Sequence, residues 1–192
     1  GLSGVEVATS DAHEGLVQAL REAFPGLIWQ RCQAHFRRNM IDQMPSGYRD
    51  RMHQILDQLL EASSQSDMQR RFEELSGEIE EKAPAALEVL EDGLFDATAV
   101  LALPGKYRRR LRTTNMLERF IEEIRRREKV IRIFPNIGSV ERLVGALCAE
   151  THEEWSTGRR YLTMDAFFEW KKLYQAPEPE AEKSTEPALV AT

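Results

Sequence analysis

The alternation of apolar and polar positions predicts two short strands and a helix near the start of the chain. Residues 5–10 form a strand-like apolar run, and residues 13–24 have the three- and four-residue apolar spacing of an amphipathic helix. Pro25-Gly26 breaks that helix, and residues 27–29 form a second short apolar run. Strand, helix and strand in this order favour parallel strands in an α/β core. A further helix is expected from about residue 34 to residue 45.

The segment 46–104 is helical in its apolar period and poor in strand-forming residues. The runs YRDRMHQILDQLLEAS and SDMQRRFEELSGEIEE both carry apolar residues at helical spacing. Ser66 or Asp67 is expected to cap the second of these helices, and Pro84 suits the first turn of a third. We therefore interpret 46–104 as an all-helical insertion that takes no part in the sheet.

Two longer helices are predicted after this insertion. The first should run from about Thr113 to Lys129, and the second from Ser139 to about Trp155, with a break at the FPN sequence between them. The end of the chain, residues 173–192, is rich in Pro, Glu and Ala and is expected to be disordered. One face of the first helix is apolar and is expected to face the core: Met116, Leu117, Phe120, Ile121 and Ile124.

The composition favours a globular domain over a membrane protein or a disulfide-rich scaffold. The chain has 192 residues, of which 42% are hydrophobic and 30% charged, and these values suit one globular domain with an insertion. No apolar run is long enough to span a bilayer. Two cysteines are too few for a disulfide scaffold, so a cytoplasmic location is expected. The chain opens on Gly1 and enters a strand almost at once, which suggests a piece of a longer protein.

Charge is distributed unevenly along the chain. The formal net charge is −6, but residues 57–96 hold twelve acids and three bases, whereas residues 103–132 hold eleven bases and four acids. The first segment therefore has a net charge of −9 and the second of +7. This asymmetry indicates a local basic surface and a separate acidic module.

Asp11 follows the first predicted strand and permits two interpretations. Its carboxylate could cap the next helix, with Glu14 completing a capping box. Alternatively, Asp11 could bind a metal ion at the carboxyl end of the strand, where α/β sheets tend to place their chemistry.

Glu118 lies on a helix face crowded with charge. A wheel at 100° per residue groups it with Asn115, Arg119, Glu122, Arg125, Arg126 and Lys129. Charge pairs three or four residues apart would explain this face. However, bases outnumber acids, and the sequence RRRLRTTN places four arginines, two threonines and an asparagine at the helix entrance. Surplus positive charge and free hydroxyl and N–H groups suit phosphate binding.

Three blocks of the sequence resemble the signature blocks of Mutator-type insertion-sequence transposases. They are SDAHEGL, WQRCQAHFRRN and TTNMLERF…RRR…FPN, and the resemblance covers about residues 1–170. It implies an RNase H-like core with an Asp-Asp-Glu triad, in which Asp11 is the second aspartate and Glu118 the glutamate. Cys32 and His35 match the Cys-x-x-His signature of the family, and His35 is taken as a candidate catalytic residue.

The resemblance also implies a domain organisation. Residues 1–45 would be strands and helices of the core, and 46–104 the acidic helical insertion. The core would continue through 105–172 with the Glu-bearing helix, before the tail at 173–192. The resulting fold class is α/β, mostly helical, with a partial RNase H-like core and an all-α insertion.

The chemistry implied by the resemblance is metal-dependent cutting and transfer of DNA strands. Asp11 and Glu118 would share two Mg²⁺ or Mn²⁺ ions, with their carboxylates within about 8 Å. The partners would be DNA, at the element ends and the target, and further copies of the chain in a homodimer or larger assembly, with no membrane. The candidate DNA-binding residues are His13, Arg112, Thr114, Asn115, Arg119, Arg125 and Arg126.

One departure from the family pattern limits this expectation. The triad has a first aspartate upstream, and no aspartate precedes Asp11 in the sequence. The chain therefore resembles the C-terminal half of such an enzyme and is expected to be inactive alone. Glu122 shares the polar face with Glu118 and is a rival metal ligand.

Two other classes of function stay open at this point. Cys32-x₂-His35 and Cys148-x₃-His152 have the spacing of zinc-ligand pairs and could form a zinc-stabilised binding module. Alternatively, the chain could be a non-catalytic fragment that binds DNA through its basic helix or a partner through its acidic helices.

Overall fold

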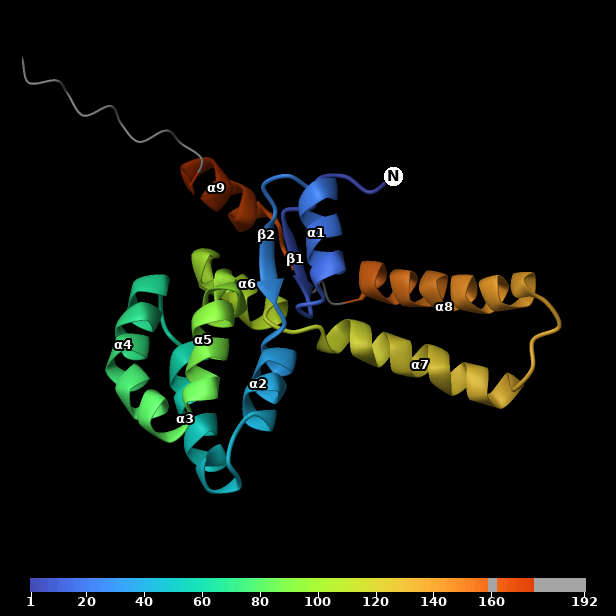
Figure 1. The fold of residues 1–192 in the computed structure, drawn as a ribbon. Coiled ribbons are helices and arrows are strands. Elements are labelled where there is room, and N and C mark those ends of the chain that lie inside the picture. The colour runs from blue at the N-terminus through green and yellow to red at the C-terminus, as the bar shows by residue number, and fades with distance from the viewer. Residues whose placement is uncertain (159–161, 175–192) are drawn as a thin grey trace, which may run out of the picture. The chain divides into compact units, whose positions relative to one another are not determined.

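A computed structural model describes residues 1–158 and 162–174, which are mostly helical (Figure 1). The chain divides into two compact units, Gly1–Tyr161 and Leu162–Thr192. Of the second unit the structure describes one helix, α9 (Asp165–Tyr174). The predicted tail 173–192 therefore begins two residues too early, because residues 173 and 174 still belong to α9, and residues 175–192 lie outside the described residues. No helix in the described part of the chain is long and apolar enough to cross a membrane.

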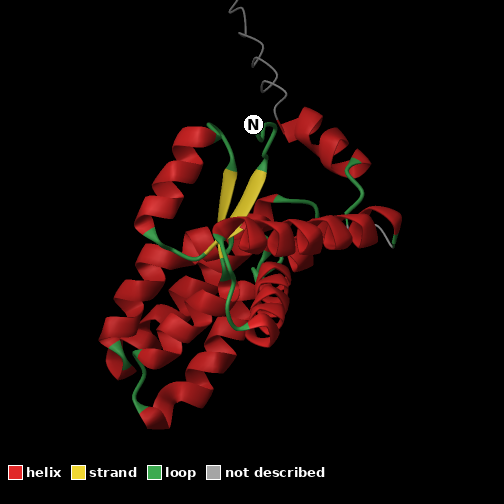
Figure 2. Cartoon of the chain, turned by 90° about the vertical axis from the view of Figure 1, so that its right-hand side faces the viewer, coloured by secondary structure: helices red, strands yellow, loops and turns green. Residues whose placement is uncertain are grey.

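The first unit contains a small parallel sheet of two strands, β1 (Val7–Ser10) and β2 (Ile28–Arg31), drawn in yellow in Figure 2. They are joined by α1 (Glu14–Ala23), so the predicted strand–helix–strand unit is confirmed. Val7 lies opposite Ile28, and Ser10 opposite Arg31. The described residues contain no strand beyond these two, so they do not by themselves make up an RNase H-like sheet.

The segment 46–104 is helical, as its apolar period predicts. After α2 (Gln33–Asp42) come η1 (Ser46–Tyr48), α3 (Arg49–Leu60), α4 (Gln65–Lys82), α5 (Pro84–Ala97) and η2 (Ala99–Ala102). Pro84 occupies the first turn of α5, where its missing N–H costs no hydrogen bond. These helices share one apolar core with α2, which contributes Phe36 and Met40. The core of the helices in 46–104 therefore continues into α2, which follows β2 in the chain.

The cap of α4 differs from the prediction. The N-cap is Ser64, whose hydroxyl accepts from the N–H of Asp67 at 3.1 Å, and not Ser66 or Asp67. The Asp67 carboxylate in turn accepts from the N–H of Ser63 at 2.9 Å. The backbone hydrogen bond from Ser63, with Arg71 and Arg70 beside it, holds the pKa of Asp67 well below its usual range. In a run rich in serine, this reciprocal bonding decides which residue begins the helix.

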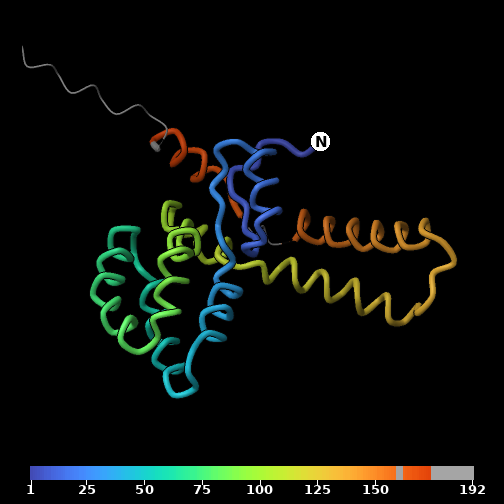
Figure 3. The backbone as a smooth tube through the Cα atoms, viewed as in Figure 1, coloured from blue at the N-terminus to red at the C-terminus, as the bar shows by residue number. Residues whose placement is uncertain are grey.

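Three further helices complete the first unit: α6 (Gly105–Leu111), α7 (Asn115–Ile131) and α8 (Ile137–Thr157). In Figure 3 the chain runs outward along α7 and returns along α8. Asn136, the last residue of the FPN sequence, caps α8 by accepting from the N–H of Ser139 at 3.0 Å, so this helix begins two residues earlier than predicted. Arg132 ends α7 with a φ of 63°.

The apolar face of α7 is not a core face in this structure. No residue of α7 is buried, and Leu117 is 56% exposed. The prediction that this face lies against the core is therefore wrong for the described residues. The helical period identified the face, but the sequence alone could not show which surface covers it.

Candidate catalytic carboxylate site

Asp11 leaves the carboxyl end of β1 with an exposed side chain. The capping interpretation of this residue is wrong, because the N-cap of α1 is His13 and no side chain caps this helix. The Ser10 hydroxyl donates to the Asp11 carbonyl at 2.7 Å and accepts from the Trp29 indole N–H at 2.9 Å. The backbone of Asp11 is thus held, while its carboxylate has no partner among the residues that the structure describes.

Glu118 projects from the first turn of α7 and is fixed by two neighbours. The Thr114 hydroxyl donates to Glu118 Oε1 at 2.9 Å, and His35 Nε2 lies 3.7 Å from the same oxygen. His35 comes from the first turn of α2, and its Nδ1 is buried without a hydrogen-bond partner in the described structure. The side chains of the matched Cys-x-x-His and glutamate blocks therefore meet in space.

Cys32 connects the sheet to α7. It directly follows β2, is fully buried, and donates its backbone N–H to the Ser10 carbonyl at 2.7 Å. Its sulfur lies 3.3 Å from the Thr114 hydroxyl oxygen and accepts from the Thr114 N–H at 3.4 Å. Burial raises the pKa of the Cys32 thiol, but hydrogen bonds from Thr114 and His35 lower it by more, so that this pKa lies below its ordinary value.

Two other contacts hold the α6–α7 junction against β1 and the start of α2. The Thr9 hydroxyl donates to the Leu111 carbonyl, and the Gln33 N–H donates to the Arg112 carbonyl at 2.9 Å. Residues about 80 to 100 positions apart in sequence are thereby joined. The start of α7, with Glu118, consequently lies at the same end of the sheet as Asp11.

The predicted metal site is not complete within the described residues. No group of three or more His, Cys, Asp and Glu side chains there is arranged to hold a metal ion. Glu122 lies one turn after Glu118 on α7 and is exposed, so the choice between these two ligands stays a prediction.

The zinc arrangement is not formed. Cys32 is buried at the end of β2, whereas Cys148 is exposed on α8. Cys148 and His152 line an apolar cavity of about 440 Å³ together with residues of α7, including Phe120. The two Cys/His pairs do not combine into a metal site in the described part of the chain.

The candidate DNA-binding residues occupy different environments. Asn115, Arg119 and Arg125 are exposed, and so is His13 at the start of α1. Arg126 is already engaged, because its Nε and Nη2 donate to the Glu123 carboxylate at 2.6 and 2.7 Å. Arg112 is half-buried and, with Arg108 and Arg109, lines a cavity of about 280 Å³ that begins near the end of β2.

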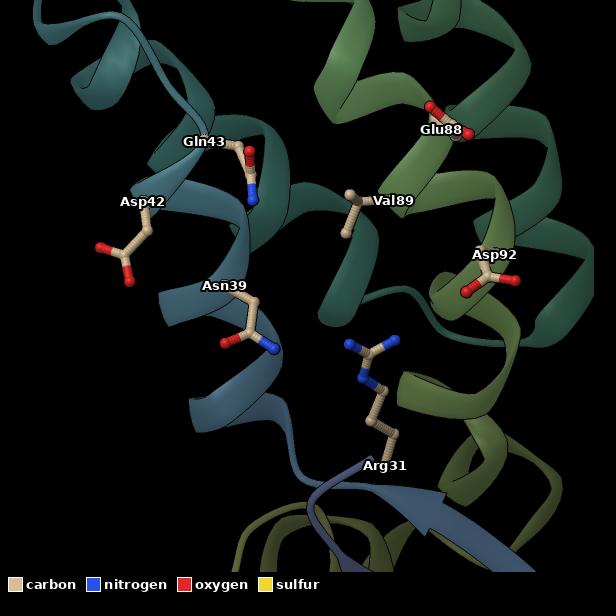
Figure 4. A pocket seen from close by; sticks show the side chains of 7 residues that line it. All are labelled: Arg31, Asn39, Asp42, Gln43, Glu88, Val89 and Asp92. Carbon is tan, nitrogen blue, oxygen red and sulfur yellow. The ribbon is translucent and has the colours of Figure 1, made fainter. Parts of the chain in front are cut away.

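A third cavity, larger than the one beside Arg112, lies between α2 and α5 and differs from it in charge. Its volume is about 550 Å³, and Figure 4 shows Arg31 extending into it from the end of β2. Three of its lining residues are acidic: Asp42, Glu88 and Asp92. With one arginine against three acids, this cavity is unsuited to phosphate. The Arg31 guanidinium instead lies 5.0 Å from the centre of the Phe36 ring.

The sequence pattern did not reveal the contacts that link Glu118 to Thr114 and Thr114 to Cys32. The sequence predicts Thr114 as a DNA contact, but its position four residues before Glu118 also lets it reach that carboxylate along the helix. Cys32 directly follows a predicted strand, and this position was the one sign that its side chain could contact another segment at the end of the sheet.

Comparison with known proteins agrees with the resemblance of the three blocks. A family model described as "Transposase, Mutator family" matches residues 1–158. A transposase for insertion sequence element ISRM5 from Rhizobium meliloti (strain 1021) is 41% identical over 173 residues, which are 90% of this chain and 44% of the relative. A transposase for IS1081 from Mycobacterium tuberculosis is 35% identical over 96% of this chain and 45% of its own length. A transposase for IS256 in transposon Tn4001 from Staphylococcus aureus is 37% identical over 86% of this chain and 43% of its own length. The chain thus spans less than half the length of these relatives.

Proposed function

Because the chain belongs to the Mutator family of transposases, we propose that it supplies two carboxylates with which a longer transposase cuts and joins DNA strands. Asp11 and Glu118 are the proposed pair, and phosphoryl transfer dependent on divalent metal is the proposed reaction. The relatives of this chain are transposases, and this supports DNA as the proposed class of substrate.

The observation that carries this proposal is the series of contacts from Ser10 through Cys32 and Thr114 to Glu118. It follows the end of the sheet where Asp11 leaves β1. Functional groups of α/β proteins gather at the carboxyl ends of parallel strands. The arrangement therefore supports a shared site, in which the two carboxylates are expected within about 8 Å of each other, close enough to share a pair of ions.

The donor chemistry of this pair fits Mg²⁺ or Mn²⁺, which prefer hard oxygen ligands. When bound, such ions would activate a water or a 3′-hydroxyl and stabilise the leaving oxygen of an in-line displacement at phosphorus. Two carboxylates are too few ligands for two ions. We infer that the first aspartate, and the strands that complete an RNase H-like core, belong to the part of a full-length protein outside this chain.

The surrounding side chains of the chain have roles in holding DNA. Asn115 and Arg119, exposed in the first turns of α7, are placed to contact phosphates near Glu118. His35 lies beside Glu118 Oε1, where it could orient the carboxylate or a nearby phosphate. Assembly of the complete protein as a homodimer or larger oligomer stays a prediction.

The decisive experiment compares metal-dependent nicking of the element end by four proteins: the chain alone, a chain extended upstream, and Asp11→Asn and Glu118→Gln in the extended chain. We expect cleavage only by the unmodified extended chain, because the two carboxylates of the chain alone would be too few to hold the metal ions. Both substitutions should leave DNA binding largely intact, since they remove negative charge.

Two further proteins sharpen this experiment. Glu122→Gln tests the rival ligand, and Glu128→Gln, an exposed acid farther along α7, is the matched control. Loss of cleavage in Glu122→Gln but not in Glu118→Gln would move the metal site one turn along the helix. Cleavage by the chain alone that survives Asp11→Asn would contradict the mechanism.

A non-catalytic DNA-binding role is the second candidate. It is favoured by the surplus of exposed bases on α7 and by the incomplete ligand set of the described residues. Duplex binding by an extended chain that never cleaves DNA, at any Mg²⁺ or Mn²⁺ concentration, would support it over the enzyme.

A further inference from the structure

We propose that Cys32 and Thr114 form a hydrogen-bond relay that positions the Glu118 carboxylate for metal binding. The inference deepens the proposed function and rests on it, because Glu118 is the metal ligand of that proposal. Neither residue is proposed to touch DNA phosphate or metal in this role. They act on Glu118 and are positioning residues.

The use of the Thr114 hydroxyl is the first observation behind this inference. Thr114 occupies the N-cap of α7, where a threonine side chain commonly accepts from a free backbone N–H of the first turn. It makes no such bond here. Its hydroxyl instead donates to Glu118 Oε1 at 2.9 Å. Helix α7 thus lacks the stabilising side-chain cap that Thr114 could provide. The Thr114 hydroxyl instead holds the Glu118 carboxylate in place.

A count of hydrogens assigns the remaining donors. The Thr114 hydroxyl has one hydrogen, which it gives to Glu118. While the thiol is protonated, the contact of 3.3 Å between this hydroxyl oxygen and Cys32 Sγ therefore has the thiol as its donor. The Thr114 N–H donates back to the same sulfur at 3.4 Å. Cys32 thus contacts both the hydroxyl oxygen and the N–H of Thr114. These contacts orient the Thr114 hydroxyl so that it donates to Glu118.

The relay is anchored at the end of the sheet. Cys32 is fully buried, and its own N–H is bonded to Ser10 in the neighbouring strand at 2.7 Å. Glu118 lies on an exposed helix, but its orientation is thereby fixed relative to the sheet that carries Asp11. Partners of this kind commonly set the orientation of a metal-binding side chain.

The relay also gives the two oxygens of the Glu118 carboxylate different surroundings. Oε1 receives the Thr114 hydroxyl and faces His35 Nε2 at 3.7 Å. Oε2 has no protein partner within the described residues and is the oxygen left for a metal ion. Loss of the relay would let the carboxylate rotate away from this arrangement.

The first test needs neither metal nor activity and uses the 192-residue chain. The side-chain carboxyl carbon of Glu118 is observed by NMR and assigned by its loss in Glu118→Gln. Thr114→Val and Cys32→Ala remove the relay, whereas Thr114→Ser and Cys32→Ser retain a hydroxyl donor at each position. Cys148→Ala, at the exposed cysteine, is the matched control.

The relay predicts that Thr114→Val and Cys32→Ala both shift this resonance, and that the two serine variants restore its position. Cys32 does not contact Glu118 itself, but His35 lies beside both residues. The relay therefore also predicts that Cys32→Ala causes no further shift when Thr114→Val is already present. A resonance that is unmoved by Cys32→Ala, or moved as far by Cys148→Ala, would overturn the proposal. Thermal unfolding identifies a variant that fails to fold. If Cys32→Ala fails, Cys32→Val takes its place, because valine fills the buried space but cannot donate to Thr114.

The second test measures cleavage by the extended chain. Thr114→Val and Cys32→Ala should lower kcat about 10- to 100-fold, with KM for DNA unchanged, and the serine variants should recover most of the lost rate. If Glu118→Gln abolishes cleavage while Thr114→Val and Cys32→Ala cleave at the unmodified rate, the relay alone is refuted. If Glu118→Gln itself cleaves at the unmodified rate, the proposed function fails, and the NMR result still decides the relay.

Discussion

Gln30 shows how one buried polar side chain joins the sheet to the helices of segment 46–104. Its amide is fully buried in β2. Its Oε1 accepts from the Val100 N–H at 2.8 Å, and its Nε2 donates to the Ala97 carbonyl at 2.7 Å. Both partners lie at the C-terminal end of α5 and in η2. A buried amide with satisfied donors and acceptors specifies one docking geometry, which apolar contact alone would not do.

We expect Gln30→Leu to lower the free energy of unfolding by about 2 kcal/mol. Leucine fills much of the same volume, but the Val100 N–H is left buried without its partner. Gln18→Leu, at an exposed position of α1, is the control and should change stability by less than about 0.5 kcal/mol. Urea denaturation followed by circular dichroism measures both. Equal stability of the two variants would show that the Gln30 hydrogen bonds contribute nothing net.

At the level of elements, α3 and α4 are joined by an ion pair that couples stability to pH. Arg51 donates to both oxygens of Glu78 at 2.8 and 2.6 Å, and the Tyr48 hydroxyl donates to the same carboxylate at 2.8 Å. The hydrogen bonds from Arg51 and then Tyr48 lower the pKa of Glu78 from 4.5 to about 2. Burial, together with Glu78, raises the pKa of Tyr48 to about 12.

The sign of the pH effect follows from the lowered pKa of Glu78. The ionised carboxylate stabilises the fold above the unfolded pKa of 4.5, and this contribution is lost as the pH falls through about 2. We expect Glu78→Gln to be less stable than the unmodified chain at pH 7, and this difference to disappear between pH 4.5 and 2. Denaturation at a series of pH values measures it. Glu80→Gln, an exposed position on the same helix, should stay close to the unmodified chain at each pH. A deficit for Glu78→Gln that is constant down to pH 2 would contradict the coupling.

The charged face of α7 allows the DNA-binding proposal to be tested one arginine at a time. Arg126 shares the Glu123 carboxylate with Arg127, whereas Arg125 has no partner among the described residues. Arg125→Ala should therefore reduce the slope of log K against log salt by about one unit for binding to unrelated duplexes. Arg126→Ala should reduce it less, because its guanidinium is already neutralised. Fluorescence anisotropy at several salt concentrations compares them, and a greater effect of Arg126→Ala would refute this assignment.

The helices illustrate what the sequence could and could not predict. Apolar period and proline position identified 46–104 as helical and placed Pro84 correctly. The capping residue of α4 was wrong, because three serines compete there and only the bonds of Ser64 and Asp67 decide between them. The site was harder. Blocks around Asp11, Cys32 and Glu118 could be recognised, but their joining through Thr114 depends on contacts across about 80 residues that no local pattern encodes.

At the scale of the whole molecule, the first unit has apolar surface that its own described residues do not cover. Leu117 on α7, Ile133 after it and Trp155 on α8 are 56%, 82% and 52% exposed. The relatives are more than twice as long as the aligned region. We therefore interpret this surface, and the edge of β1 that does not face β2, as sites where the chain alone is prone to associate.

The contrast between the two cysteines makes the chain suitable for labelling without any substitution. Cys148 is exposed on α8, whereas Cys32 is enclosed and hydrogen-bonded at the end of β2. A maleimide fluorophore should therefore attach first at Cys148, next to the apolar cavity shared by α7 and α8. Its emission would report the polarity around this cavity in real time. The upstream half of a full-length relative would be mixed with the labelled chain before any DNA is added. A blue shift in the emission would then give the rate at which this apolar surface becomes buried.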